Sequence, residues 1–502
     1  MVQIGIVFLA VFLALMTGIG IWGMKKTKTL GDFFLGGRTL GPWVSAVAYG
    51  TSYFSAVIFI GFAGTQGWQF GLSSLWIALG NAIIGAGAAW FILARRTRRM
   101  TQNLDTMTMP EFLQERYGAK HLKPLAASVI FFFLLPYSAS VFKGLGHLFE
   151  AVFGIPYDTA LLIMIAFTGV YLILGGYFAI AITDFIQGII MFAGAAVMVL
   201  VISGNGGGLI EIFGKAAAAY QAHIPPEKQP ALLTVVSLVF MTSFGTWGLP
   251  QMTQKFYAIK NEKVIPKAAI VTTVFALMIG FAAYATGAFS HVFFDTTTVP
   301  QRTLPDGTTQ ILYDEIIPTL LTGQLAGKFQ YLLALILLLV LSASMSTLSS
   351  LVLVSSSSVA IDLYPSRQDA KTGKDRSVAM MRFLSGIFII ISYFISRFQI
   401  SFIVYLMSLS WGVVSGAFAA PYILGLYSKR VTKAGAYAGL LTGIVTMITL
   451  FFVLGSSRSP LAASISIILP FIVVTGVSAF TAPPEKALLD KAFAGVVINA
   501  LH

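Results

Sequence analysis

Apolar residues occur along this chain in long runs, and short polar segments separate the runs. An α-helix needs roughly 20 mostly apolar residues to cross the hydrocarbon core of a bilayer, which is about 30 Å thick. The pattern therefore predicts thirteen membrane-spanning helices. Their expected bounds are 4–24, 41–64, 73–93, 124–151, 159–174, 180–203, 233–255, 268–289, 331–359, 378–396, 402–427, 434–454 and 461–480. The expected fold class is an all-α polytopic membrane protein.

Composition supports this interpretation and narrows the function. Of the 502 residues, 57% are hydrophobic and 10% are charged, whereas a soluble protein has roughly 45–50% apolar and about 25% charged residues. The chain contains no cysteine, which excludes a disulfide scaffold and thiol catalysis. The sequence also lacks the paired carboxylates or the histidine cluster that a membrane enzyme would need. We therefore expect no catalytic residues and no enzymatic activity.

Basic residues are distributed unevenly between the two sets of loops. The net charge is +13, and 25 of the 32 Lys and Arg residues follow odd-numbered predicted spans. Because cytoplasmic loops are enriched in Lys and Arg, this side is expected to face the cytoplasm. We expect a multi-pass protein of the inner (plasma) membrane with its amino terminus outside and its carboxyl terminus inside. The positive charge is thus a topology signal and does not indicate nucleic-acid binding.

Small polar residues and glycine interrupt two predicted spans near their middle. The second span contains AYGTSYFSA at 48–56, and the seventh contains TSFGTWGLP at 242–250. A helix that unwinds there frees carbonyl groups for a cation and amide groups for an anionic part of a substrate. The alternative is that glycine allows close helix packing and proline produces a kink.

Hydroxyl groups form a stripe on the ninth predicted span. Ala343, Ser346, Thr347 and Ser350 have the spacing of one helical face, with Ser349 at its edge. Their oxygens are suited to a small, hard cation. Ser and Thr in membrane helices also commonly donate to the carbonyl one turn back, so both interpretations stay open from the sequence alone.

Two charged residues, Asp184 and Lys143, are placed well inside the predicted spans, and each has two interpretations. Asp184 lies near the cytoplasmic end of the sixth span, where it is either a helix cap or an ion ligand. Lys143 lies about two turns from the outer end of the fourth span, where its amine either reaches the interface or meets an anion inside the bundle. A substrate carboxylate or the nearby Glu150 would supply that anion, and Lys143 would then be an anion partner or a gate.

Several short segments of the chain resemble the sodium/solute symporter family, which includes sodium/proline, sodium/galactose, pantothenate and sialic acid transporters. They occur in the family's order along most of the chain. The segments are DFFLGGRTLGP at 32–42, GIPYDTAL at 154–161, YLILGGY at 171–177, GLP at 248–250 followed by Lys255 and Phe256, ASMSTLS at 343–349, and WGVVSGAF at 411–418.

This resemblance implies a leucine-transporter-type core of two inverted five-helix repeats with broken first helices, where such folds place their substrate and ions. The expected organisation is an extra first helix (1–30), a first repeat (31–204), an external loop (205–230), a second repeat (231–430), and two peripheral helices with a cytoplasmic tail (431–502).

The resemblance also implies a sodium site. Backbone carbonyls of Thr51, Phe54 and Ala343 and side-chain oxygens of Ser346 and Thr347 match the family's set. Members that bind a second sodium ion use an acidic residue of the sixth helix with serines of the ninth. The residues that match this second set are Asp184, Ser346, Ser349 and Ser350.

The substrate is expected midway through the membrane, between the second, fourth, seventh and eleventh spans. In the family's proline transporter an Asp replaces Tyr53 and Trp residues replace Val57 and Thr242, so the ion site is matched more closely than the proline site. The residues expected to bind the substrate are Ser52, Ser55, Tyr137, Thr242 and Trp247, with Phe54 as a neighbour.

Together these observations predict a secondary transporter that couples inward sodium movement to uptake of a small polar solute by alternating access. An amino acid or an organic acid is favoured over a sugar by Lys143. The alternatives are proton-coupled or uncoupled transport on the same fold, and a sugar or sialic-acid type of substrate. The expected partners are one or two sodium ions, the small-molecule substrate and membrane lipid, with no nucleic acid and no obligatory protein partner.

Overall fold

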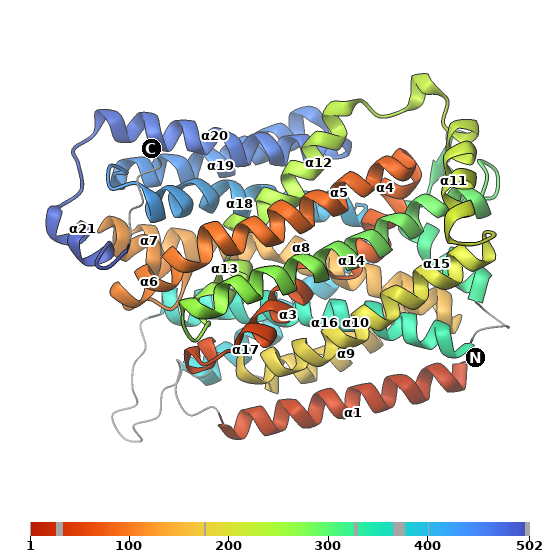
Figure 1. Ribbon diagram of the computed structural model, residues 1–502, viewed down its shortest axis with the longest axis horizontal. Helices are drawn as coiled ribbons and strands as arrows, with labels where there is room; N and C mark the ends of the chain where they lie inside the picture. The colour runs from red at the N-terminus through yellow and green to blue at the C-terminus, as the bar shows by residue number, and fades with distance from the viewer. Residues whose placement is uncertain are drawn as a thin grey trace.

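The computed structural model describes residues 2–26, 34–174, 177–325, 330–364, 377–399 and 401–496. Within these ranges the chain is a bundle of helices, and the single sheet is a two-stranded hairpin (Figure 1). Parts of the predicted motifs, at Asp32, Phe33, Gly175 and Gly176, lie outside the described residues.

The first half of the chain extends to residue 223, at the end of α11. Its elements are α1 (Val2–Lys26), η1 (Gly36–Arg38), α3 (Pro42–Tyr53), η2 (Val57–Phe62), α4 (Ala63–Phe70), η3 (Gly71–Ser74), α5 (Leu75–Gly80), η4 (Asn81–Ala88), η5 (Trp90–Ala94), α6 (Arg95–Asn103), α7 (Met109–Tyr117), α8 (Leu122–Phe153), α9 (Tyr157–Leu174), α10 (Tyr177–Asn205) and α11 (Leu209–His223).

The second half begins with a broken helix and ends with two long helices followed by a short one. Its elements are η6 (Pro226–Lys228), α12 (Leu232–Phe244), η7 (Gly245–Gly248), α13 (Pro250–Tyr257), η8 (Glu262–Val264), α14 (Ile265–Phe293), β1 (Gln301–Thr303), β2 (Thr309–Ile311), α15 (Tyr313–Leu325), α16 (Gln330–Ser357), η9 (Ser358–Leu363), α17 (Ser377–Arg397), α18 (Ile403–Tyr427), α19 (Lys433–Leu454), η10 (Ser456–Arg458), α20 (Ser459–Phe480) and α21 (Lys486–Ala492).

Each of the thirteen predicted spans overlaps helix in the described ranges, but fewer helices qualify as spans individually. Ten are long and apolar enough to cross a membrane, or eleven if the bent pair α12–α13 is counted as one span. The count falls because the second predicted span is broken after α3, and its remainder joins the third in one helical stretch, Val57–Asn103. The apolar part of α9 that was counted, Tyr157–Ala166, is also shorter than a full span.

Both predicted interruptions are present as breaks in helices. The α3 helix ends at Tyr53, and Phe54 is extended, with φ −110° and ψ 130°. Leu249 is extended between η7 and α13, and the two halves of that span bend by 48°. Pro250 opens α13, where a missing N–H costs nothing and the fixed φ suits a helix start.

Glycine allows neighbouring helices to touch backbone to backbone at two crossings. A Cβ on Gly67 of α4 would lie 2.2 Å from the backbone of Gly287 on α14, and a Cβ on Gly443 of α19 would lie 2.1 Å from the backbone of Gly416 on α18. Small residues at such crossings let helices pack closely without a hydrophobic driving force. In Figure 1, α1 lies along one edge of the bundle, and α19 and α20 lie along the opposite edge.

The two ends of the bundle differ in the elements that cover them. α6, α7 and α21 lie at the end that holds the carboxyl terminus, and α11 and α15 lie at the end that holds the amino terminus (Figure 1). Of these helices, α7, α11 and α15 lie with the β1–β2 hairpin in the hydrophilic segments 100–123, 204–230 and 291–328. α6 carries the basic run RRTRRMTQN.

Candidate functional site

The break after α3 exposes backbone oxygens inside the bundle. Thr51 and Ser52 donate their own hydroxyls to the carbonyls of Val47 and Ala48, at 2.9 and 2.7 Å. This is the back-bonding that commonly occupies hydroxyls in membrane helices. The hydrogens of these two hydroxyls are therefore used within the helix, and the carbonyl groups at the end of α3 add further oxygens that can bind something else.

Thr347 on α16 faces these carbonyls. Its Oγ1 lies 3.4 Å from the Thr51 oxygen and 3.3 Å from both the Ser52 and the Phe54 oxygens. A hydroxyl has a single hydrogen, so it can donate fully to only one of the three carbonyls. The other carbonyl oxygens keep their lone pairs free, and the cluster is rich in oxygen acceptors. Ala343 and Ser346 lie on the same helix and are fully buried, like Thr51 and Thr347. The structure thus places Thr347 against the carbonyls of Thr51 and Phe54, with Ala343 and Ser346 within one turn of Thr347 on α16.

Ser344 holds the other side of the break, and the sequence analysis did not select it. Its hydroxyl accepts from the Ala56 N–H at 3.0 Å and donates to the Val340 carbonyl at 2.7 Å. The helix that resumes at Ala56 is thereby attached to α16. The sequence does contain a signal for Ser344, because this residue lies within the family motif at 343–349.

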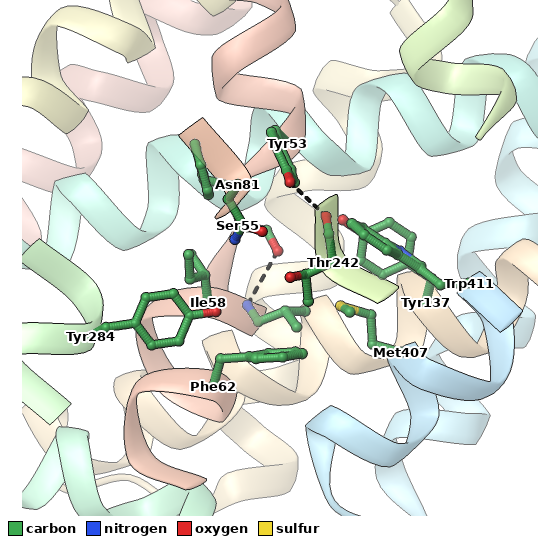
Figure 2. A pocket seen from close by; sticks show the side chains of 12 residues that line it. Tyr53, Ser55, Ile58, Phe62, Asn81, Tyr137, Thr242, Tyr284, Met407 and Trp411 are labelled. Carbon is green, nitrogen blue, oxygen red and sulfur yellow. Dashed lines mark hydrogen bonds between the residues drawn. The ribbon is translucent and has the colours of Figure 1, made fainter. Parts of the chain in front are cut away.

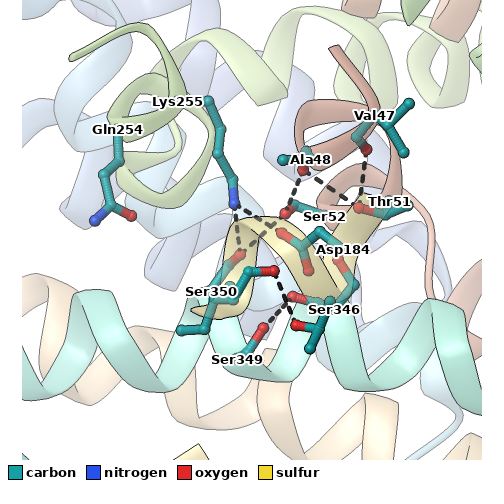
Figure 3. A network of polar contacts seen from close by, with 12 residues as sticks. Val47, Ala48, Thr51, Ser52, Asp184, Gln254, Lys255, Ser346, Ser349 and Ser350 are labelled. Carbon is teal, nitrogen blue, oxygen red and sulfur yellow. Dashed lines mark hydrogen bonds and ion pairs between the residues drawn. The ribbon is translucent and has the colours of Figure 1, made fainter. Parts of the chain in front are cut away.

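The second predicted set contains an unpredicted lysine (Figure 3). Lys255 lies 3.4 Å from Asp184 Oδ2 and 3.1 Å from Ser350 Oγ. The sequence counted Lys255 as a basic residue at the cytoplasmic end of a span, but its side chain is 1% exposed. That expectation was wrong because the chain bends between η7 and α13, so the end of the predicted span packs inside the bundle.

A small cavity lies beside the break in α3 (Figure 2). Aromatic rings and small polar groups form its wall, and none of its described lining residues is charged. The lining residues are Tyr53, Phe54, Ser55, Val57, Ile58, Phe62, Asn81, Tyr137, Thr242, Tyr284, Met407 and Trp411.

Three of the five residues predicted to bind substrate line this cavity, namely Ser55, Tyr137 and Thr242. The other two point elsewhere. The Ser52 hydroxyl lies 2.9 Å from Ser350 Oγ, and the Trp247 indole donates to the Ile84 carbonyl at 3.1 Å.

Trp411 is the principal cavity residue that the sequence analysis did not assign, although it lies in the motif at 411–418. Its ring packs edge-on against Tyr137, with 5.7 Å between ring centres. The buried Trp411 N–H lies near the Tyr137 hydroxyl but makes no hydrogen bond of ordinary geometry within the described ranges. The Tyr137 hydroxyl is thus the nearest acceptor for this N–H, and a molecule bound in the cavity would compete with it.

The family follows from comparison of the sequence with known proteins. The model of the sodium:solute symporter family matches residues 33–443. The chain belongs to this family. The symporter is 31% identical to the osmoregulated proline transporter OpuE of Bacillus subtilis over 497 residues, which cover 97% of this chain and 96% of the relative. It is also 31% identical to sodium/proline symporter 2 of Staphylococcus saprophyticus over 450 residues, covering 88% and 85% of the two chains.

Solved structures show the same fold. The substrate-bound, outward-open structure of a Na⁺-coupled sialic acid symporter matches with a TM-score of 0.76 and 21% identity, covering 96% of this chain and 99% of that chain. The inward-facing structure of Mhp1 matches with a TM-score of 0.54 and 15% identity, covering 90% and 94%. The symporter is therefore a multi-pass membrane protein of the leucine-transporter type, and not an enzyme.

Lys143 is buried in this symporter and is paired with a carboxylate of the protein. Its Nζ lies 2.7 Å from Asp314 Oδ2 on α15 and donates to the Ser401 carbonyl at 2.9 Å. The Ile403 N–H also donates to Asp314 Oδ2, at 3.3 Å. The interpretation of Lys143 as a lysine that reaches the interface is therefore wrong. Its anionic partner is Asp314 and not Glu150. The sequence analysis missed this partner because Asp314 lies between two predicted spans, in a segment expected outside the membrane.

A second ion network lies near the other end of α8. Lys123 is 3.1 Å from Glu111 Oε1 and 3.5 Å from Asp362 Oδ1, and the Thr108 hydroxyl donates to Asp362 at 2.8 Å. These residues tie α7, α8 and η9 together. The symporter thus has an ion pair toward each end of α8, buried at Lys143 and partly buried at Lys123, with the cavity lined by α8 residue Tyr137 between them.

Proposed function

We propose that this symporter couples the inward movement of sodium to the uptake of a small, net-neutral polar solute, with a zwitterionic amino acid as the favoured class. The observation that carries the proposal is the convergence of three backbone carbonyls of the α3 break on the Thr347 hydroxyl of α16. A cluster of hard oxygens at a helix break is the arrangement by which such transporters coordinate sodium.

Sodium at this cluster would be held by the carbonyls of Thr51, Phe54 and Ala343 and by the hydroxyls of Ser346 and Thr347. These groups come from two helices, α3 and α16, that are far apart in sequence. An ion between them stabilises the conformation in which both helices are close. Coupling requires that sodium bind one conformation better than the other, and ligands drawn from two separate helices provide that difference.

The cavity supports a small solute with no net charge. The free space between the lining side chains as they lie is about 20 Å³, which is room for little more than one water molecule, so a solute that binds here would be small and would displace side chains of the wall. The described lining residues are uncharged, and the lysine that had favoured an organic acid is already paired with Asp314. The Trp411 N–H would face a carboxylate, and the carbonyls and ring faces would receive an amine.

Alternating access would open the cavity to one side at a time. We infer that 31–204 and 231–430 are the two inverted repeats, that 1–30 is an extra helix, that 205–230 is an external loop, and that 431–502 is peripheral. With the amino terminus outside, α11 and α15 cover the outer end, and α6 and α7 cover the inner end. Lys143 with Asp314 would then belong to an outer gate, and Lys123 with Asp362 to an inner gate.

Uptake of radiolabelled neutral amino acids into proteoliposomes tests the proposal. We expect accumulation when sodium is imposed outside with an inside-negative potential, and no accumulation when choline replaces sodium. A proton gradient without sodium should not drive uptake. Uptake that follows the proton gradient and ignores sodium would favour the proton-coupled alternative, and accumulation of a sugar but no amino acid would overturn the substrate class.

A further inference from the structure

Lys255 lies among the oxygens that form the second predicted cation set (Figure 3). Its Nζ is 3.4 Å from Asp184 Oδ2, 3.1 Å from Ser350 Oγ, and 5.2 Å from the centre of the Tyr177 ring. The Lys255 and Asp184 side chains are 1% and 0% exposed. A carboxylate, a hydroxyl and an aromatic face are each groups that bind a monovalent cation.

The directions of the hydrogen bonds show that Ser350 is committed to this lysine. An ammonium group only donates, so Ser350 Oγ accepts from Lys255. The single hydrogen of the Ser52 hydroxyl is donated to the Ala48 carbonyl at 2.7 Å. Ser350 must therefore donate to Ser52 across the 2.9 Å that separates their oxygens. The lone pairs of Ser350 are left facing the ammonium, and the chain of bonds links α13, α16 and α3.

The rest of the second set does not fit a further cation while Lys255 is in place. The serines of the set, Ser346, Ser349 and Ser350, are neutral, so Asp184 supplies the only negative charge of the set. Asp184 is the carboxylate that pairs with Lys255, and a sodium ion beside it would put two cations against one negative charge where water is excluded and repulsion is poorly screened.

We propose that the Lys255 ammonium is a built-in occupant of the second cation position, so that the symporter binds one sodium ion. This inference rests on the proposed sodium coupling. The lysine does permanently what a second sodium would do transiently, since it joins α13 to α10 and α16. Removing its charge should convert Asp184, Ser346 and Ser350 into a sodium site.

Direct binding of ²²Na⁺ to the purified, full-length protein in detergent tests this inference without a substrate. The variants are Lys255→Met, the double variant Asp184→Asn with Lys255→Met, and Lys260→Met. Lys260 is exposed and lies close in sequence, so it is a matched control for loss of a positive charge. We expect one ion per molecule for the wild type, for Lys260→Met and for the double variant, and two for Lys255→Met.

Each other result has a defined meaning. Two ions bound by the wild type would overturn the inference and leave sodium coupling intact, as would a single ion bound by folded Lys255→Met. No sodium bound by the wild type would instead reject the proposed coupling. If Lys255→Met does not fold, Lys255→Gln replaces it, and the wild-type count still decides whether the second position takes sodium.

Discussion

Replacement of Thr347 by valine tests the sodium site with little change of shape. Valine keeps the volume and branching of threonine and removes the hydroxyl that faces the three carbonyls at 3.3 to 3.4 Å. An interaction between a hydroxyl and a charged group contributes about 1.5–3 kcal/mol. Since each 1.4 kcal/mol is tenfold in affinity, the sodium concentration for half-maximal uptake should rise by roughly 10- to 150-fold.

The assay is a sodium titration of uptake at saturating substrate, with Thr347→Ser as the matched variant that retains the hydroxyl. The hydroxyl also bonds to neutral carbonyls, so Thr347→Val should lose about 1 kcal/mol of folding stability, which thermal unfolding without sodium measures separately. Unchanged sodium dependence in folded Thr347→Val would refute the assignment. An equal shift in Thr347→Ser would show that packing, and not the oxygen, accounts for the effect.

Three further substitutions test other parts of the structure. Lys143→Met should lower stability by about 3–5 kcal/mol because it leaves Asp314 buried and unpaired, and the double variant with Asp314→Asn should recover much of that loss; equal Tm values for the two would contradict the pairing. Trp411→Phe keeps the ring and removes the N–H, so the substrate concentration for half-maximal uptake should rise about tenfold while sodium dependence stays the same; the reverse pattern would move Trp411 out of the substrate site. Gly67→Ala should cost about 1–3 kcal/mol by forcing α4 away from α14, whereas Gly214→Ala, whose Cβ meets nothing within 4 Å, should not, and indistinguishable unfolding temperatures would show that the crossing adapts.

The breaks in the helices were predictable because their cause is local. Glycine, proline and small polar residues weaken a helix wherever they gather, and both such segments, 48–56 and 242–250, contain breaks. The hydroxyl stripe on α16 was also readable, since a spacing of three and four residues places side chains on one face. The partner of that stripe, α3, was assigned by resemblance.

The buried ion pairs were not predictable, because tertiary packing alone creates them. Lys143 and Asp314 are 171 residues apart, and Lys255 and Asp184 are 71 residues apart. Counting apolar residues assigns almost every charge to a loop, so Lys255 was placed at a surface and Asp314 outside. A bend after Gly248 and a helix within an external segment bring these charges inside the bundle. The break near Gly248 was predictable, but no periodicity of the sequence shows how α13 and α15 pack after it.

The close contact between α18 and α19 has a consequence for the surrounding lipid. Trp411 of α18 lines the cavity, while the backbone of Gly416 on the same helix meets Gly443 of α19, where there is no room for a side chain. α19 also carries Phe452 and Val453, which are 79% and 72% exposed. A movement of α18 would therefore drag a broad apolar surface through the acyl chains. Turnover of the symporter should then slow as the bilayer stiffens, so that membrane viscosity becomes a kinetic parameter of transport.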